Sequence, residues 1–132
     1  MRVCLDTSAY SHFKRGHAPA VEAIGGAREV LVPAIVLGEL RVGFRLGGRP
    51  QENEAELAEF LGGSAVRTLD VNAESADLYA DIVVDLRRAG TPVPTNDVWI
   101  AALAAQEGAA VVTYDDHFTA IRRVGLRLLP KP

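Results

Sequence analysis

Acidic side chains occur at four places where ordinary helix and strand patterns give no full account of them. Asp6 and Asp115 each follow a short apolar run. Glu39 has apolar neighbours three and four residues away on an expected helix, so its carboxylate needs a partner or a metal ion. Asp97 opens an alanine-rich helix. These four residues are the first candidates for a chemical function.

Four carboxylates that share one site constrain the chemistry of that site. Like charges repel and raise one another's pKa unless a cation neutralises them. Oxygen ligands without cysteine or histidine suit Mg²⁺ or Mn²⁺. Such ions coordinate phosphate oxygens, activate water and stabilise a leaving oxygen. The carboxylates therefore predict metal-dependent phosphoryl-transfer chemistry, without specifying a nuclease.

Each strand-end or helix-start carboxylate also has a local structural interpretation. Asp6 could cap the helix that follows it, although Thr7 and Ser8 could also do so. Asp97 lies in the first turn of its helix, where the macrodipole stabilises an acidic residue. Of the adjacent Asp115 and Asp116, one could cap the next helix, which leaves the second unexplained.

Short apolar runs alternate with helical patterns along the whole chain, and a parallel sheet covered on both faces follows from this order. In such doubly wound folds the functional crevice lies beyond the carboxyl ends of the strands. The expected strands are Arg2–Leu5, Val30–Val32, Val66–Leu69, Ala110–Thr113 and Leu126–Leu129. The expected helices are Ser8–Arg15, Pro19–Ile24, Ala34–Leu46, Glu52–Leu61, Ala73–Ala89, Thr95–Glu107 (with Thr95 as N-cap) and His117–Arg122.

The composition describes one α/β domain over residues 1–132. Hydrophobic residues make up 48% of the chain and charged residues 23%, which indicates a globular core. Cys4 is the only cysteine, so an internal disulfide and a cysteine zinc site are excluded. With no apolar run of roughly 18 residues and no signal-peptide pattern, we expect a cytoplasmic protein without membrane contact. The net charge of −3 argues against binding through bulk positive charge, although carboxylates in a metal site would weaken that argument.

Four motifs in this order and at this spacing resemble the PIN-domain ribonucleases, and within them the VapC-type toxins of bacterial toxin–antitoxin pairs. The resemblance covers nearly the whole chain. The motifs are Leu5-Asp6-Thr7-Ser8, Gly38-Glu39-Leu40, Asn96-Asp97-Val98-Trp99-Ile100-Ala101-Ala102 and Val112-Thr113-Tyr114-Asp115-Asp116-His117-Phe118.

The resemblance implies a five-stranded parallel sheet of order 3-2-1-4-5 between helices. It also implies Mg²⁺- or Mn²⁺-dependent endonucleolytic cleavage of RNA by a metal-activated water, a homodimer and a small antitoxin partner. By position, the family's catalytic and metal-binding carboxylates are Asp6, Glu39, Asp97 and Asp115. The matching auxiliary residues are Thr7, Ser8 and Thr113, which would orient carboxylates or water, and Asp116, where the family more often has another residue type.

Basic residues near the first two carboxylates are candidates for contacts to the RNA backbone. They are Lys14, Arg15, Arg41 and Arg45, and solvated helix surface is the alternative for each. Arg41 or Arg45 could instead form an ion pair with Glu39, although Arg41 is poorly spaced for this on a helix.

Two other functional classes stay open at this point. The chain could be a non-catalytic RNA- or protein-binding module of the same fold, or a Mg²⁺-dependent phosphatase of another doubly wound fold. The three histidines share no metal-ligand spacing, and His117 is interpreted as a residue at a helix start. Trp99 is expected to pack in the core, with base stacking as the alternative, and Tyr79 to lie in the core or on a dimer surface.

Overall fold

The computed structural model describes residues 1–132, and its centre is a parallel sheet of order β3-β2-β1-β4-β5. The strands are β1 (Arg2–Leu5), β2 (Glu29–Pro33), β3 (Val66–Leu69), β4 (Ala110–Thr113) and β5 (Gly125–Leu128). Val3 of β1 pairs with Val30 of β2 on one side and with Ala110 of β4 on the other. β1 is therefore the central strand, and its last three residues are buried because both faces of the sheet are covered.

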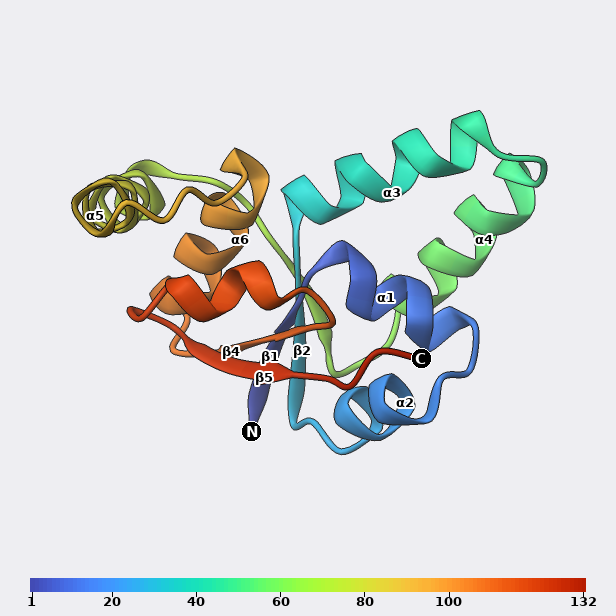
Figure 1. Cartoon of the computed structure of the whole chain (residues 1–132). Coiled ribbons are helices and arrows are strands. Elements are labelled where there is room, and N and C mark those ends of the chain that lie inside the picture. Colours follow the sequence, from blue (N-terminus) through green and yellow to red (C-terminus); the bar gives the residue numbers. More distant parts are fainter.

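Helices cover the two faces unequally (Figure 1). One side carries α1 (Thr7–Lys14), α2 (Ala18–Gly25), α3 (Ala34–Leu46) and α4 (Pro50–Leu61). The other carries α5 (Ala73–Ala89), α6 (Thr95–Gln106) and a short 3₁₀ helix, η1 (Asp116–Ala120). Right-handed crossovers produce this division, because the chain moves outward through β2 and β3 before it returns to β4. α6 packs directly on β1, β2 and β4, with α5 against its outer side.

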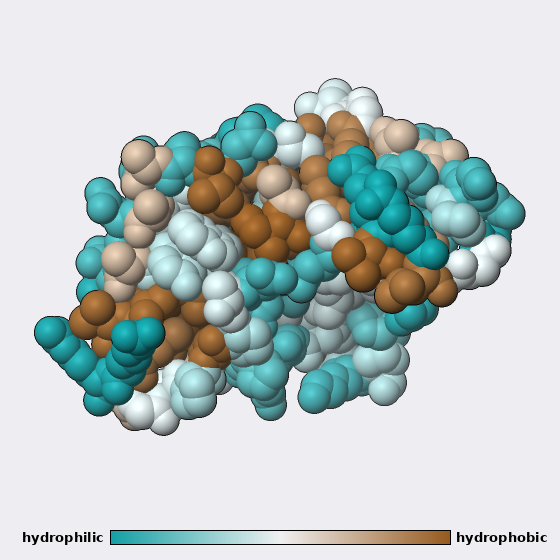
Figure 2. Space-filling view, turned by 90° about the horizontal axis from the view of Figure 1, so that it is seen from above, coloured by the Kyte–Doolittle hydropathy of each residue, from teal (hydrophilic) through white to brown (hydrophobic).

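α3 and α4 form a helical hairpin that extends away from the sheet (Figure 1). The turn between them contains Gly47 and Gly48, and Pro50 opens α4, where its missing N–H has no helical partner to lose. Val42 and Leu46 on α3 are 58% and 85% exposed. Figure 2, which views the molecule from above, shows hydrophobic patches next to hydrophilic side chains on the surface of this part of the molecule. No helix of the chain combines the length and apolar character needed to cross a membrane.

The sequence predicted the fold class, the strand order and most of the elements. The bounds of α3, α5 and β3 are as predicted, and β5 begins one residue earlier than expected. The prediction that Thr95 is an N-cap is wrong. Pro94 occupies the cap position with an extended backbone and no side-chain bond, and Thr95 is the first helical residue. The predicted helix His117–Arg122 is the 3₁₀ turn at Asp116–Ala120.

Candidate active site

A polar cleft of about 520 Å³ lies at the carboxyl end of the sheet. It brings together the four carboxylates singled out from the sequence: Asp6 after β1, Glu39 on α3, Asp97 at the start of α6 and Asp115 after β4. Thr7, Ser8, Pro94, Thr95 and Asn96 complete the lining, so no lysine or arginine lines the cleft.

Asp6 is both a helix cap and a member of the cleft, so the two interpretations of this residue hold together. Its Oδ1 accepts hydrogen bonds from the Ala9 backbone N–H at 2.9 Å and from Ser8 Oγ at 2.7 Å. Its Oδ2 accepts one from Thr113 Oγ1. Only 4% of Asp6 is exposed, and this burial raises its pKa, while the three hydrogen bonds oppose the increase. The carboxylate is thus fixed in orientation but unpaired with any positive charge.

Glu39 reaches the cleft from the α3 hairpin rather than from the sheet. Thr7 Oγ1 donates to Glu39 Oε1 at 2.6 Å, and Asn96 Nδ2 donates to Oε2 at 3.2 Å. The alternative of an ion pair with Arg41 or Arg45 is wrong. Arg41 turns towards α4, where its Nε lies 3.1 Å from Glu54 Oε1.

Among the cleft carboxylates, Asp97 carries the clearest electrostatic perturbation. It lies half-buried in the first turn of α6 and forms no ion pair. Burial raises its pKa to about 6, and the charges of Asp115, Asp6 and Glu39 add to the increase. A helix N-terminus favours a negative charge, so the increase occurs against the helix dipole. The neighbouring carboxylates therefore share one electrostatic site.

Asp115 joins this site through a histidine that the sequence interpretation set aside. Asp115 is the N-cap of η1, and its Oδ1 accepts a hydrogen bond from the backbone N–H of His117 at 2.9 Å. The ring Nδ1 of His117 lies 2.9 and 3.1 Å from the two carboxylate oxygens of Asp115. Ligand atoms of Asp97, Asp115 and His117 all lie within 4.8 Å of one another. Asp115 and His117 are only two residues apart in the sequence, but it is the backbone turn that begins η1 which brings their side chains together.

The auxiliary residues differ in their relation to the cleft. Ser8 and Thr113 both donate to Asp6, and Thr113 Oγ1 also accepts from the Asp115 backbone N–H at 2.9 Å. Thr113 therefore links the two strand-end carboxylates. Asp116 is exposed and outside the cleft, on the first residue of η1.

The four basic candidates do not line the acidic cleft. Lys14 and Arg15 border a separate groove between α1 and the α3–α4 hairpin, where Lys14 Nζ lies 3.7 Å from a Glu56 oxygen. Arg41 is paired with Glu54, and Arg45 is exposed in the last turn of α3. A contact from these residues to RNA would therefore involve flanking nucleotides.

The donor set fits a divalent cation. Carboxylate oxygens converge without a lysine or arginine to neutralise them, and Asp97 carries the raised pKa expected of such an arrangement. Carboxylates suit Mg²⁺ and Mn²⁺, and one imidazole nitrogen at the rim is compatible with Mn²⁺. Asp97 and Asp115 would hold the ion with His117 at the rim, and Asp6 and Glu39 complete the carboxylates around it.

Comparison with known families agrees with this fold. The model of the family described as PIN domain matches residues 3–124, and the chain therefore belongs to the PIN domain family. Within the family it is similar to ribonuclease VapC5 of Mycobacterium tuberculosis, with 33% identity over 117 residues that cover 89% of this chain and 85% of the relative. Ribonuclease VapC4 of the same organism is 32% identical over 90 residues, which cover 68% and 69% of the two chains.

Solved structures give the same relationship. A DNA-bound VapBC from Salmonella typhimurium matches with a TM-score of 0.83 at 27% identity, over 96% of this chain and 97% of that chain. VapBC-5 of Mycobacterium tuberculosis, a member of a family of toxin–antitoxin systems, matches with a TM-score of 0.72 at 27% identity, over 97% and 98%. VapBC2 of Rickettsia felis matches with a TM-score of 0.84 at 24% identity, over 98% and 100%, which is a likeness of fold.

Proposed function

We propose that this chain is a divalent-metal-dependent endoribonuclease, the toxin of a VapC-type toxin–antitoxin pair. The observation that carries the proposal is the convergence of four carboxylates, without a lysine or arginine in the lining, at the carboxyl end of a PIN-domain sheet. The names of its relatives, ribonucleases VapC5 and VapC4, favour RNA over other phosphodiesters as substrate.

The chain's own residues would have distinct roles at the cleft. We assign Asp6, Glu39, Asp97 and Asp115 to the metal-binding and catalytic set, with Mg²⁺ or Mn²⁺ as the ion. A divalent cation bound there supplies charge neutralisation at the scissile phosphate and lowers the pKa of a bound water. Ser8 and Thr113 keep Asp6 in one rotamer by donating to its two oxygens.

The environment of Glu39 differs from that of the three aspartates, and it suits Glu39 to orienting a water molecule or transferring a proton as well as to binding the metal. Its two oxygens are held by Thr7 and Asn96, which belong to the two elements that flank the cleft. Arg45, on the same helix as Glu39, and Arg15 are both exposed and form no ion pair, so these two candidates are free to contact a flanking phosphate.

The partners follow from the relatives and remain part of the proposal. Structural relatives such as VapBC-5 are toxin–antitoxin assemblies, so we infer a small antitoxin protein that covers this chain. From the family resemblance we also propose a homodimer. Val42 and Leu46 on α3 leave apolar side chains in water that a partner chain would cover.

The test is cleavage of a mixed RNA pool by the partner-free protein, with Mg²⁺, Mn²⁺ or EDTA. We expect metal-dependent cleavage that falls by about a thousandfold or more in Asp6→Asn and in Asp97→Asn, because each removes a carboxylate whose charge holds the ion. Glu29→Gln, a variant at the opposite end of the sheet, should cut at the parent rate. Equal cleavage by Asp97→Asn and the parent would overturn the metal-site assignment.

The two other classes give different results in the same preparations. A phosphatase would hydrolyse p-nitrophenyl phosphate in the presence of Mg²⁺ and leave RNA intact. A non-catalytic module would bind RNA or a protein with no cleavage under any metal condition, and Asp97→Asn would not change that binding.

A further inference from the structure

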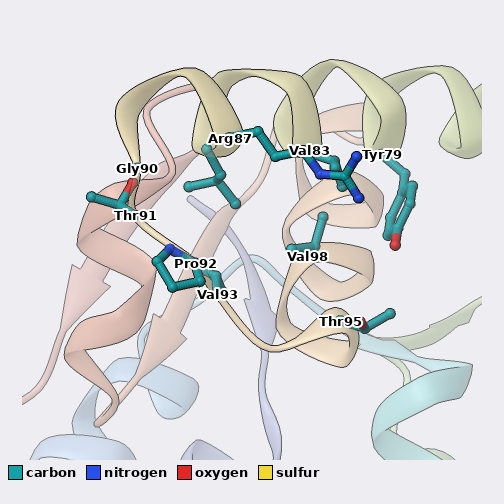
Figure 3. A pocket seen from close by; sticks show the side chains of 10 residues that line it. Tyr79, Val83, Arg87, Gly90, Thr91, Pro92, Val93, Thr95 and Val98 are labelled. Carbon is teal, nitrogen blue, oxygen red and sulfur yellow. The ribbon is translucent and has the colours of Figure 1, made fainter.

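A second cavity lies on the far side of the loop that leads into α6. It measures about 330 Å³ and is enclosed by the C-terminal half of α5, residues 90–93 and the first turn of α6 (Figure 3). Gly90 ends α5 with a positive φ of 69°, a conformation that a side chain would strain, and this lets the chain turn back beneath the helix. The cavity is therefore a product of the helix–loop–helix geometry and is present without a ligand.

The lining combines an apolar floor with a single charge. Val83, Val93 and Val98 form the floor, and Arg87 is the only charged residue among the lining residues. Figure 3 shows the Arg87 side chain extending along α5 towards Tyr79. Arg87 is exposed and forms no ion pair, so its guanidinium is available to a ligand. An apolar slot beneath an unpaired guanidinium suits a flat, electron-rich ring that carries an anionic group.

An aromatic stack lies at one end of the cavity. The rings of Tyr79 and Trp99 lie 3.9 Å apart at an interplanar angle of 18°. Trp99 is partly exposed and packs against Tyr79, and Tyr79 also lines the cavity. Single-stranded RNA is recognised by placing unstacked bases against aromatic rings and arginine planes.

Thr95 connects this cavity with the acidic cleft. Thr95 lines both, and the cleft continues from it through Asn96 to Asp97. A single strand of RNA whose phosphate lies in the cleft would therefore pass the mouth of the cavity at a neighbouring nucleotide. This inference rests on the proposed function for its substrate class.

We propose that the cavity between α5 and α6 is a nucleobase subsite, which takes an unpaired RNA base next to the cleaved phosphate under the guanidinium of Arg87. The occupant is a purine or pyrimidine ring with its phosphate directed towards Arg87. The base preference of the nuclease would then depend on a part of the chain outside the carboxylate cluster.

The test measures binding without cleavage. Valine methyl signals of the ¹³C-labelled full chain are followed while each of the four nucleoside 5′-monophosphates is added in EDTA, so that no metal bridges the phosphate to the acidic cleft. The methyls of Val83, Val93 and Val98 should shift and saturate, and those of Val21 on α2 should not. Ribose 5-phosphate, which lacks the base, should leave the three methyls in place.

Variants distinguish the cavity from general electrostatic attraction. Arg87→Ala should weaken nucleotide binding by about tenfold. Arg88→Ala removes the neighbouring charge, which does not line the cavity, and should change affinity by less than about twofold. Thr91→Trp, at an exposed position on the rim, should abolish the shifts by filling the space while the rest of the spectrum stays native.

Three results would overturn the subsite. The first is an absence of shifts at millimolar nucleotide, and the second is equal shifts with ribose 5-phosphate. The third is shifts that depend on protein concentration rather than on nucleotide concentration, which would assign the cavity to a second copy of the chain. Failure of the ribonuclease proposal would be a separate finding, because the cleavage assay and the methyl titration are independent.

Discussion

The two ends of the sheet use the same acidic residue types under opposite conditions. At the amino end, Glu29 and Glu107 are each paired with both Arg2 and Arg67. The Arg2 hydrogen bond is the largest cause that lowers the pKa of Glu29, and the Arg67 hydrogen bond is the largest cause for Glu107. At the carboxyl end no carboxylate has an arginine or lysine partner, and burial raises the pKa of Asp97 to about 6.

This difference separates a structural acid from a functional one. The paired carboxylates stabilise the fold when they are ionised, whereas ionised Asp6 and Asp97, whose pKa values are raised, destabilise it until a cation neutralises them. The molecule therefore carries an electrostatic cost at only one end of its sheet, and that end is where the cleft lies. Variants that disturb each end should give effects of opposite sign or very different size.

Apart from the loss of a carboxylate itself, the largest of these effects should come from Thr113, whose hydroxyl bonds to both Asp6 and the backbone of Asp115. Thr113→Val removes the donor to Asp6 Oδ2 and the acceptor for the Asp115 backbone N–H, with little change in shape. We expect Mn²⁺ affinity, measured by calorimetry, to fall about 10- to 100-fold. Thr68→Val on β3, an exposed position, is the matched control. Unchanged affinity in Thr113→Val would mean that Asp6 needs no orientation to bind the ion.

A smaller effect is expected at the imidazole. His117→Ala removes the ring that lies against Asp115, and we expect Mn²⁺ affinity to fall by about tenfold. Mg²⁺ affinity should fall less, because nitrogen ligands suit Mg²⁺ poorly. Electron paramagnetic resonance of the bound Mn²⁺ should show nitrogen coupling in the parent and none in the variant. Asp116→Asn, next in sequence but outside the cleft, should match the parent, and a parent spectrum without nitrogen coupling would contradict the assignment.

The sequence predicted the carboxylates better than it predicted their surroundings, and the reason is geometric. Asp6 and Asp115 could be placed together because the ends of parallel strands meet at one edge of a sheet. The bond from Thr7 to Glu39 could not be foreseen, since it depends on how α3 crosses the end of α1. His117 was set aside because spacing along the chain says little about a tight turn whose backbone is not yet known.

The amino-end network illustrates the same limit. Arg2 and Glu29 meet because β1 and β2 pair in a register that starts at these two residues. Glu107 joins them because α6 ends beside the amino ends of the strands. Strand order itself came from the resemblance to a family, since the alternation of strands and helices permits several doubly wound orders. Thr95 was misplaced because Pro94 already supplies the extended backbone that precedes the helix.

The dependence of folding stability on pH directly tests the carboxylates at the carboxyl end of the sheet. The pKa of Asp97 rises from 3.8 to about 6 on folding, so ionisation is disfavoured in the folded state. Stability is therefore lost as the pH rises between these values and stays lost above them. In EDTA, Asp97→Asn should stabilise the protein at about pH 7.5 by of the order of 1 kcal/mol, after allowance for solvent screening of this half-exposed group. The gain should vanish near pH 4, and Asp77→Asn on exposed α5 should show neither effect. A destabilised Asp97→Asn at about pH 7.5 would contradict the unpaired state of the cluster.

The amino end should respond with the opposite sign and the smallest size. Folding lowers the pKa of Glu29 from 4.5, chiefly through its hydrogen bond from Arg2, so its ionised form contributes stability above this value. That contribution is lost as the pH falls through the lowered pKa. Glu29→Gln should lower Tm slightly at about pH 7 and match the parent in strong acid, while RNA cleavage is unchanged. Because the parent has more to lose at low pH, its Tm should fall more steeply than that of the variant. A Glu29→Gln protein that is more stable than the parent at about pH 7 would place both ends of the sheet in the same electrostatic class, and the contrast between paired and unpaired carboxylates would no longer identify the cleft.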